Sequence, residues 1–457
     1  MNEMANVDLE DLAEPLVIGA EAYKSADYAK EEGDRLWAKV WQHAGRVEEI
    51  PSVGDYFTYD IGTDSILIVR TAVDAIKAFY NVCSHRGRQL VDTPTGAHNA
   101  CGWKNQFTCG FHGWRYDLNG KCTFKLDEEN WKGALTDERT KLGEVKADIW
   151  GGWIFINMDP DCVSLREFLE PAASFLDPFE LSKMRYKWRQ WVIFDSNWKT
   201  AIEAFMEPYH VTGTHTQMLK HGQYYAYSAA HALHGVSGFD ERNPDLKMKQ
   251  SSTVTRAGKG SDARLSTYLL QNEIYTTVNN ASTTEILLNA AKRLVDELPE
   301  ETPPGEVIRH WLAAAKADDA ARGVIWPTVT PEQMSAAGLA WSIFPNMSIL
   351  HGITFALCYR TRPYGDDPNK CIFEAFAIER YPDGQAPKTD WVYAEPTEER
   401  WGLVLAQDYS NMAAVQKGMR SRGFRGALPN PHQERKITNF HRNLARFMGI
   451  GAPRLLK

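Results

Sequence analysis

Two short segments of the chain each place one cysteine close to one histidine. The first is Cys83-Ser84-His85 and the second is Cys109-Gly110-Phe111-His112. A [2Fe-2S] cluster with two thiolates on one iron and two imidazoles on the other requires this set of side chains. Glycines beside both segments would let backbone N–H groups approach the sulfurs. The sequence therefore predicts four cluster ligands, Cys83, His85, Cys109 and His112.

A structural zinc site is the alternative for these four side chains. Zinc modules usually group two cysteines in one knuckle and two histidines in another. Each segment here mixes the two residue types, and this mixing favours the cluster. The remaining cysteines have no histidine at matching spacing and are predicted to be reduced packing residues: Cys101, Cys122, Cys162, Cys358 and Cys371.

A second histidine pair, His210 and His215, could bind a mononuclear metal. Two imidazoles and one carboxylate form a facial triad that leaves positions open for O₂ on Fe(II). Five residues of regular helix rotate a side chain by about 140°, so both rings could not face one metal from an unbroken helix. Pro208 and Gly213 predict that the helix kinks or ends here. Helical geometry also places Glu203 and Glu207 on the stripe of His210. A solvated acidic face is the alternative for these glutamates, and for Glu203 it explains the pattern nearly as well.

The elements around these segments change character along the chain. Residues 19–45 have the apolar spacing of a helix, and residues 45–160 contain short β-branched or aromatic runs separated by turn residues. From 161 to 457, helical and strand-like segments are mixed, with an insertion-like helical region at about 256–327. We therefore predict an α+β chain with an N-terminal helical segment (1–44), a small all-β domain (45–160) and a larger domain (161–457) built on an antiparallel sheet flanked by helices.

Composition narrows the class of protein. The 457 residues are 43% hydrophobic and 24% charged, which is typical of soluble globular domains. A formal net charge of -8 gives no electrostatic basis for binding nucleic acid or an anionic membrane. No apolar run is long enough to span a bilayer and no signal peptide is visible. Seven cysteines, an odd number, favour a reducing compartment, so we expect a cytoplasmic protein.

The extended strings Cys83-Ser84-His85-Arg86-Gly87 and Cys109-Gly110-Phe111-His112-Gly113-Trp114 closely resemble the Rieske domain of the Rieske non-haem iron oxygenases. Two details differ from the usual family pattern. The 23 residues between His85 and Cys109 are a longer separation than is common, and Gly110 and Phe111 stand where Pro and Tyr are frequent. Neither difference removes a ligand.

The segment from Asn197 to His215 and the late region around Gln407-Asp408-Tyr409 resemble the catalytic motifs of the same family. The resemblance implies that Fe(II) is held by His210, His215 and Asp408. It also implies that Glu207 occupies the place of the acid, more often Asp, that connects this iron to a Rieske histidine of a neighbouring subunit. Glu379 and Asp383 are the other candidates for the carboxylate ligand.

The resemblance implies a helix-grip-like catalytic domain and a terminal oxygenase that takes electrons from a reductase or ferredoxin. It further implies O₂ as co-substrate, a small aromatic substrate, and a trimer, with or without a small β subunit. Ring dihydroxylation, as in aromatic hydrocarbon catabolism, is the favoured reaction, and monohydroxylation or O- or N-demethylation is the alternative. A pure Rieske electron carrier would need only the first motif, and about 300 further residues argue against it.

Overall fold

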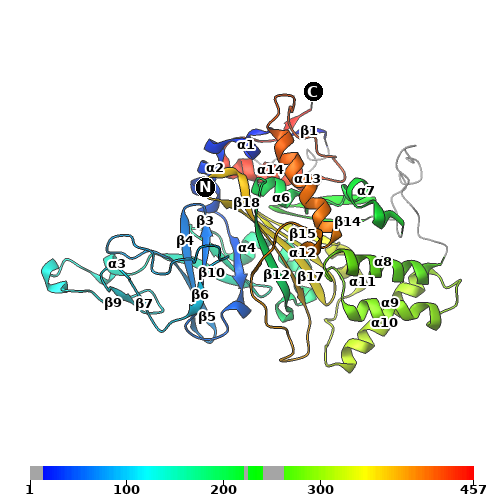
Figure 1. The fold of residues 1–457 in the computed structure, drawn as a ribbon, viewed down its shortest axis with the longest axis horizontal. Coiled ribbons are helices and arrows are strands. Elements are labelled where there is room, and N and C mark those ends of the chain that lie inside the picture. Colours follow the sequence, from blue (N-terminus) through cyan, green and yellow to red (C-terminus); the bar gives the residue numbers. More distant parts are fainter. Residues whose placement is uncertain (1–13, 221–224, 240–261, 457) are drawn as a thin grey trace. The chain divides into compact units, whose positions relative to one another are not determined.

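The computed structural model describes residues 14–220, 225–239 and 262–456. These residues divide into two compact units, which Figure 1 colours along the chain. The smaller unit comprises Ala29–Phe168 with Pro363–Asp366, where the sequence predicts a β domain over 45–160. The larger unit combines Leu169–Arg362, Asp367–Lys457 and the segment up to Tyr28. The predicted N-terminal segment is therefore divided between the units, and its residues 1–13 lie outside the described residues.

The smaller unit is built on a seven-stranded antiparallel sheet in the order β2-β11-β10-β5-β4-β3-β6. Its strands are β2 (Gln42–Arg46), β3 (Asp55–Ile61), β4 (Asp64–Ala72), β5 (Ala75–Tyr80), β6 (Cys101–Trp103), β10 (Glu144–Trp150) and β11 (Trp153–Asn157). A second sheet consists of β7 (Phe107–Thr108), β8 (Arg115–Tyr116) and β9 (Cys122–Phe124). Leu67 and Phe79 from the large sheet share one hydrophobic core with Phe107 and Tyr116 from the small sheet. This core anchors the loops that follow β5 and β7.

The predicted helix over residues 19–45 ends earlier than its apolar spacing suggested. The chain forms α1 (Glu21–Lys24), α2 (Ala26–Glu32) and a π-helical turn (Gly33–Trp37), and then enters β2 at Gln42. All five residues of β2 are buried, and four of them pair with β11, with a register shift at Ala44. Backbone pairing at this position outweighs the local helical pattern, because buried N–H and C=O groups need partners.

The larger unit contains an eight-stranded sheet in the order β13-β14-β15-β16-β17-β18-β12-β19. Its strands are β13 (Ala226–His231), β14 (His234–Phe239), β15 (Ala340–Ile343), β16 (Met347–His351), β17 (Phe355–Tyr364), β18 (Asp367–Glu379), β12 (Arg185–Phe194) and β19 (Val392–Tyr393). The registered pairs are antiparallel except for the short β12–β19 pair. The predicted α+β class with an antiparallel sheet is confirmed.

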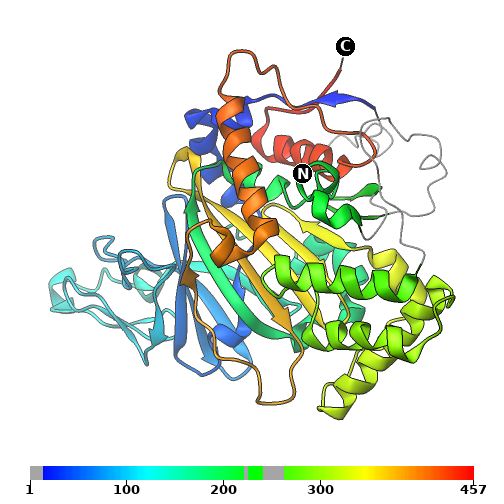
Figure 2. The same cartoon turned by 45° about the vertical axis from the view of Figure 1, so that its right-hand side comes forward.

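Helices cover this sheet and carry the candidate ligands. They are α6 (Trp198–Glu203), α7 (Val211–Thr214), α12 (Glu398–Trp401), α13 (Leu403–Met419) and α14 (Arg435–Met448). Helix α13 packs against α6, and α14 packs against β13 and β14. Figure 2 shows α13, in orange, lying across the sheet. The Asn197 side chain caps α6 by accepting a hydrogen bond from Lys199 N, which fixes where this helix begins.

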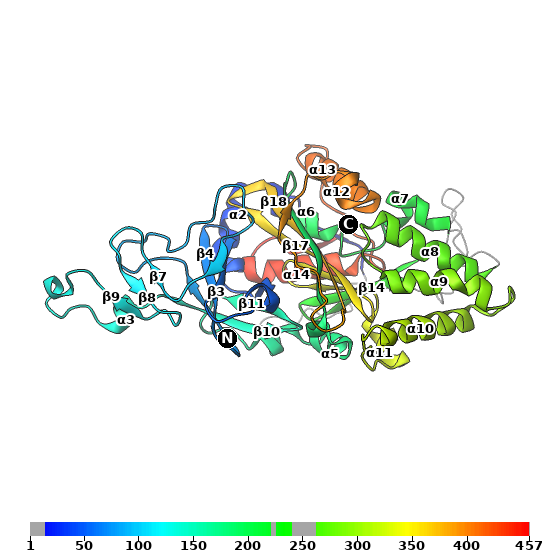
Figure 3. The same cartoon turned by 60° about the horizontal axis from the view of Figure 1, so that its bottom comes forward.

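The predicted helical insertion forms α8 (Ala263–Thr277), α9 (Glu285–Glu297) and α10 (Pro304–Ala321), which pack on one another in Figure 3. Asp262 and Thr284 cap the first two helices, and Pro303 and Pro304 mark the start of α10. Residues 256–261 of this region lie outside the described residues. The shorter elements are β1 (Leu16–Val17), α3 (Asp137–Thr140), α4 (Leu165–Leu169), α5 (Ala172–Leu176), α11 (Pro331–Ala337) and β20 (Arg454–Leu455).

Candidate metal centres and active-site cavity

The two cysteine–histidine loops of the smaller unit close in the same way. In the first loop, Cys83 N donates to Arg88 O over 2.8 Å, and Gly87 N donates to Cys83 O over 3.0 Å. The second loop repeats both bonds, with the same lengths, from Cys109 N and from Gly113 N. Gly87 and Gly113 have φ angles of 75° and 73°. Only glycine adopts this left-handed conformation without strain, which explains the glycine four residues after each cysteine.

The four predicted cluster ligands come together between these loops. The thiols of Cys83 and Cys109 are buried and lie within hydrogen-bonding reach of each other. The His85 and His112 rings are half-buried, and their centroids are 4.6 Å apart. His112 Nδ1 is buried and has no hydrogen-bond partner among the described residues. Two thiols side by side and two imidazoles side by side, one with an orphaned nitrogen, fit a two-cysteine, two-histidine [2Fe-2S] cluster.

A tyrosine hydroxyl supports the first cysteine. Tyr116 Oη lies 3.1 Å from Cys83 Sγ and accepts a hydrogen bond from Ser84 N over 3.1 Å. Because the hydroxyl already accepts from the amide, its own proton is directed at the sulfur. Burial raises the pKa of Tyr116, so this hydroxyl stays protonated as a donor. Hydrogen bonds to cluster sulfurs are one of the factors that set a cluster's reduction potential.

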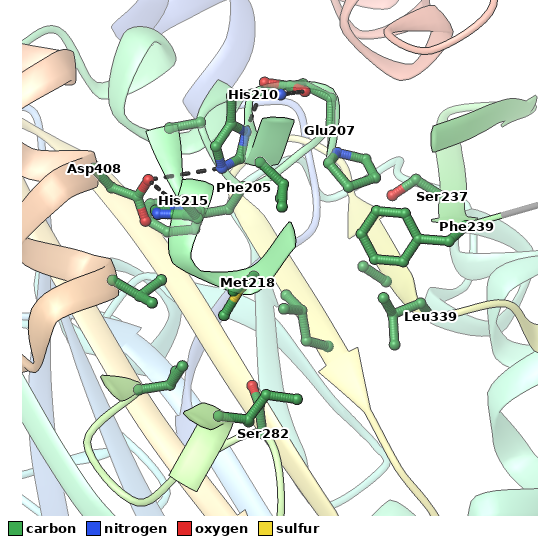
Figure 4. Close-up of a pocket in the computed structure, with 18 of the residues that line it drawn as sticks. Phe205, Glu207, His210, His215, Met218, Ser237, Phe239, Ser282, Leu339 and Asp408 are labelled. Atoms are coloured by element: carbon green, nitrogen blue, oxygen red, sulfur yellow. Dashed lines mark hydrogen bonds and ion pairs between the residues drawn. The ribbon is translucent and has the colours of Figure 1, made fainter. Parts of the chain in front are cut away.

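The second candidate centre lies in the larger unit and is drawn in Figure 4. Helix α6 ends at Glu203, and α7 begins after Pro208, so the helix breaks as the sequence predicted. His210 and His215 flank α7, and their ring centroids are 5.2 Å apart. Asp408, from α13, places Oδ1 3.6 Å from His210 Nε2 and 3.1 Å from His215 Nε2. One ligand atom from each of the three residues lies within 4.8 Å of the other two.

The other nitrogen of each imidazole has its own partner. Glu207 Oε1 lies 2.8 Å from His210 Nδ1, and Glu207 Oε2 accepts from His210 N over 2.9 Å. Gln407 Oε1 lies 2.8 Å from His215 Nδ1. An amide oxygen can only accept, so His215 carries its proton on Nδ1 and directs the Nε2 lone pair toward Asp408. This arrangement of outer partners is typical of metal-binding histidines.

The charges at this centre favour a cation. Burial lowers the pKa of His210, but the carboxylates of Glu207 and Asp408 outweigh that effect and raise this pKa to about 9. A positive charge between the two carboxylates is therefore strongly stabilised. Two imidazoles and one carboxylate form the donor set that non-haem Fe(II) prefers, and the residues present fit such an ion.

An apolar cavity of about 360 Å³ adjoins the triad. Apart from the triad and Glu207, its polar lining residues are Ser237, Ser282, His351 and Tyr359. The other walls come from the sheet strands and their ends, α8, α13 and the segment around α7. They are contributed by Ala204, Phe205, Pro208, Val211, Met218, Phe239, Leu270, Ile274, Val278, Leu339, Ala340, Leu350, Phe355 and Val404. The metal-binding set thus faces a space suited to an apolar ligand.

The other carboxylates considered from the sequence, Glu379, Asp383 and Glu203, do not contact the triad. Glu379 forms an ion pair with Lys187 over 3.0 Å, and Asp383 is exposed, and neither belongs to the candidate metal-binding group among the described residues. His351 lines the cavity, and its ring packs against Phe179 with centroids 4.4 Å apart. Glu203 contacts Tyr23 and His441 instead of the triad.

Sequence reasoning missed two residues of this site. Gln407 holds His215 and directly precedes Asp408, but an amide next to a candidate carboxylate gives no ligand signal of its own. Ser237 lines the cavity, and one serine in a short strand looks the same whether it faces a cavity or solvent. Only the strand register reveals its direction.

Comparisons with known proteins agree with the fold and the two centres. The family model for the catalytic domain of the ring-hydroxylating alpha subunit matches residues 179–278 and 291–450, and the Rieske [2Fe-2S] domain model matches residues 40–129. The chain therefore belongs to the Rieske non-haem iron oxygenases, a family of oxidoreductases, as one of their large, alpha-type subunits. Family members combine a Rieske [2Fe-2S] cluster with mononuclear iron and use O₂.

Among curated proteins, the glycine betaine monooxygenase oxygenase subunit of Pseudomonas aeruginosa (strain UCBPP-PA14) is 30% identical over 40% of this chain and 41% of its own length. The carnitine monooxygenase oxygenase subunit of Escherichia coli (strain K12) is 30% identical over 49% of this chain and 58% of its own. The large oxygenase component of naphthalene 1,2-dioxygenase from Pseudomonas aeruginosa is 33% identical over 42% of each. The matched part thus spans between 41% and 58% of these relatives.

Two solved structures share the fold at low sequence identity. A quaternary ammonium Rieske monooxygenase in complex with L-carnitine aligns with a TM-score of 0.63 and 16% identity over 98% of this chain and 100% of its own. Naphthalene 1,2-dioxygenase with indole bound aligns with a TM-score of 0.60 and 18% identity over 96% and 93%. Within the described residues, no helix is long and apolar enough to cross a membrane.

Proposed function

We propose that this chain is the terminal oxygenase component of a multicomponent system, and that it uses O₂ and electrons from a reductase or ferredoxin to dihydroxylate the ring of an apolar aromatic substrate. The observation that carries the proposal is the position of His210, His215 and Asp408 at one side of an almost wholly apolar cavity. An apolar cavity with a few polar groups at the reacting end both orients such a substrate and excludes water.

The residues divide into two sets in this proposal. The [2Fe-2S] cluster is held by Cys83, His85, Cys109 and His112, and Fe(II) is held by His210, His215 and Asp408. Together the two bound groups supply electrons to O₂ and oxygen to carbon. Glu207 orients the His210 ring through Nδ1, and Gln407 does the same for His215.

Electron supply and assembly are part of the same proposal. We expect the cluster of one subunit to serve the iron of the next in a trimer, with Glu207 between His210 and a cluster histidine of the neighbouring copy. In support, one solved relative is described as revealing inter-subunit electron transfer.

A monooxygenase or demethylase is the second candidate, and specific observations favour it. Relatives at 30% identity are named as monooxygenases of glycine betaine and carnitine. Glu207 also stands where most family members have Asp, and Glu is found there in members that act on alkylammonium compounds. Against this candidate, the described cavity wall offers no carboxylate other than Glu207 and Asp408, both occupied by histidines.

Product analysis under ¹⁸O₂ distinguishes the two reactions. The protein is supplied with a surrogate reductase and a panel of fused-ring aromatics, aromatic acids, methoxyarenes and methylammonium compounds. Two labelled oxygens in one product are expected from a fused-ring substrate. A single labelled oxygen, or released formaldehyde, would instead assign the protein to the monooxygenases or demethylases.

Replacing Glu207 tests its proposed role. The Glu207→Ala variant should still fill both iron centres when Fe(II) is supplied in excess, because neither centre uses this side chain as a ligand, but it should lose turnover. Glu203→Gln is the control four residues earlier in the chain, since Glu203 contacts Tyr23 and His441 and not the triad. Iron content, cluster absorbance and product formation are measured on both variants. Normal turnover of Glu207→Ala would show that Glu207 is not the connecting residue.

A further inference from the structure

One row of side chains in the cavity wall carries a single hydroxyl among apolar groups. In the register of the sheet, Ser237 on β14 is paired with Ala340 on β15, and Ala340 is paired with Leu350 on β16. Paired residues of neighbouring strands project to the same face, so these three side chains form one row, and all three line the cavity. Phe239, two residues after Ser237, lies on the same face.

The hydroxyl of Ser237 has no hydrogen-bond partner within the described part of the chain. The residue is only 2% exposed, and its backbone oxygen is used by Leu339 N over 3.0 Å. Figure 4 shows its side chain directed into the cavity, on the side away from Asp408. The hydroxyl borders the cavity and makes no hydrogen bond to the described residues, so a molecule bound in the cavity can complete that bond.

The charges around the cavity restrict what that molecule can be. The described lining contains no lysine or arginine, and its carboxylates are Glu207 and Asp408, which face His210 and His215. Two of its aromatic rings, Phe205 and Tyr359, stack on each other with centroids 3.8 Å apart, so the faces they share are closed to a cation. An ion in this space would lose its hydration without gaining a counter-charge.

We propose that Ser237 is the binding residue for one uncharged polar substituent, such as a hydroxyl or a carbonyl, on an otherwise apolar substrate. This assignment rests on the proposed oxygenase function and narrows its substrate class. Ser237 binds the substituent, the row of Ala340, Leu350 and Phe239 covers the hydrocarbon part, and the ring is held between Ser237 and the triad. Ser237 therefore acts in specificity and not in the chemistry at the iron.

The test is equilibrium binding to the oxidised holoenzyme without an electron donor, followed by the ligand's own fluorescence. Three probes share one ring system: naphthalene, 2-naphthol and trimethyl(2-naphthyl)ammonium. The wild-type protein should bind 2-naphthol about fivefold more tightly than naphthalene, the size of one net hydrogen bond. It should bind the cationic probe at least about tenfold more weakly than 2-naphthol.

The Ser237→Ala variant should bind 2-naphthol and naphthalene equally, with naphthalene affinity unchanged. Ser342→Ala is the matched control, because Ser342 is also a buried serine without a hydroxyl partner, lies on the adjacent strand β15, and does not border the cavity. This control should retain the fivefold preference. Melting curves of both variants establish that they are folded.

Three outcomes would overturn the assignment: a preference for 2-naphthol that survives Ser237→Ala, tight binding of the cationic probe, or no binding of either neutral probe. Turnover of the same probes is measured separately. A Ser237-dependent preference without any oxygenated product would contradict the proposed function and leave the binding assignment intact. Oxygenated products without a Ser237-dependent preference would contradict the binding assignment and leave the proposed function intact.

Discussion

Gln407 offers a sharp test of the mononuclear site, because it contacts a proposed ligand without being one. Its Oε1 lies 2.8 Å from His215 Nδ1 and also accepts from Gln217 Nε2 over 3.0 Å. The Gln407→Leu substitution removes the acceptor that fixes the His215 tautomer and ring orientation but keeps a side chain of similar size. Loss of such an outer partner typically lowers metal affinity by about 10- to 100-fold, or about 1.4 to 2.7 kcal/mol.

The assay is competition for Fe(II) between the protein and a chromogenic chelator of known affinity. The [2Fe-2S] absorbance serves as an internal standard, since Gln407 belongs to the other structural unit and the cluster should be unaffected. Asn411→Ala is the control on the same helix, because Asn411 Nδ2 donates to Thr214 Oγ1 over 3.0 Å and contacts neither imidazole. Fe(II) affinity of Gln407→Leu within twofold of the wild type, or an equal loss in Asn411→Ala, would refute the reasoning.

Two further predictions concern groups outside the iron triad. Tyr116→Phe removes the hydrogen bond to Cys83 Sγ and should lower the cluster's reduction potential by about 40 mV, the equivalent of about 1 kcal/mol for one electron; a redox titration that finds no change would contradict this. Burial lowers the pKa of His351 to about 4, whereas an unfolded histidine titrates near 6.5. The native state therefore binds fewer protons between these values, and wild-type stability should fall by about 2 kcal/mol from pH 7 to pH 5 through this group. In the His351→Gln variant, the free energy of unfolding should not show this fall between pH 7 and pH 5. An equal pH dependence of unfolding in the variant and the wild type would show that His351 is not its source.

The cluster loops could be predicted because their chemistry is local. Cys83 and His85, like Cys109 and His112, lie within one tight loop, and the glycine that closes each loop is visible in the sequence. The third iron ligand is a different case. Gln407, next to Asp408, is 192 residues from its partner His215, and no local pattern fixes a contact over that distance. Only the family resemblance singled out Asp408.

The substrate cavity was the least predictable part of the site. Its walls combine β14, β15 and β16 with α8 and the segment around α7, and strand order decides which side chains share a face. A sequence shows that Ser237 alternates with Val236 and Gly238, but not which face is buried against a cavity. The abundance of aromatic residues was no better guide, since cores use them as well.

The glutamates before His210 show how one structural feature decides two assignments. Helical spacing put Glu203, Glu207 and His210 on a single stripe, which holds only while the helix continues. The helix ends at Glu203, and this break is what allows His210 and His215 to converge. The same break removes Glu203 from the stripe, so that it accepts from Tyr23 Oη over 3.0 Å, while Glu207 stays with His210. The end of α6 at Glu203 therefore causes both the convergence of the two histidines and the separation of the two glutamates. A substitution that extended α6 through Pro208 would reverse both effects.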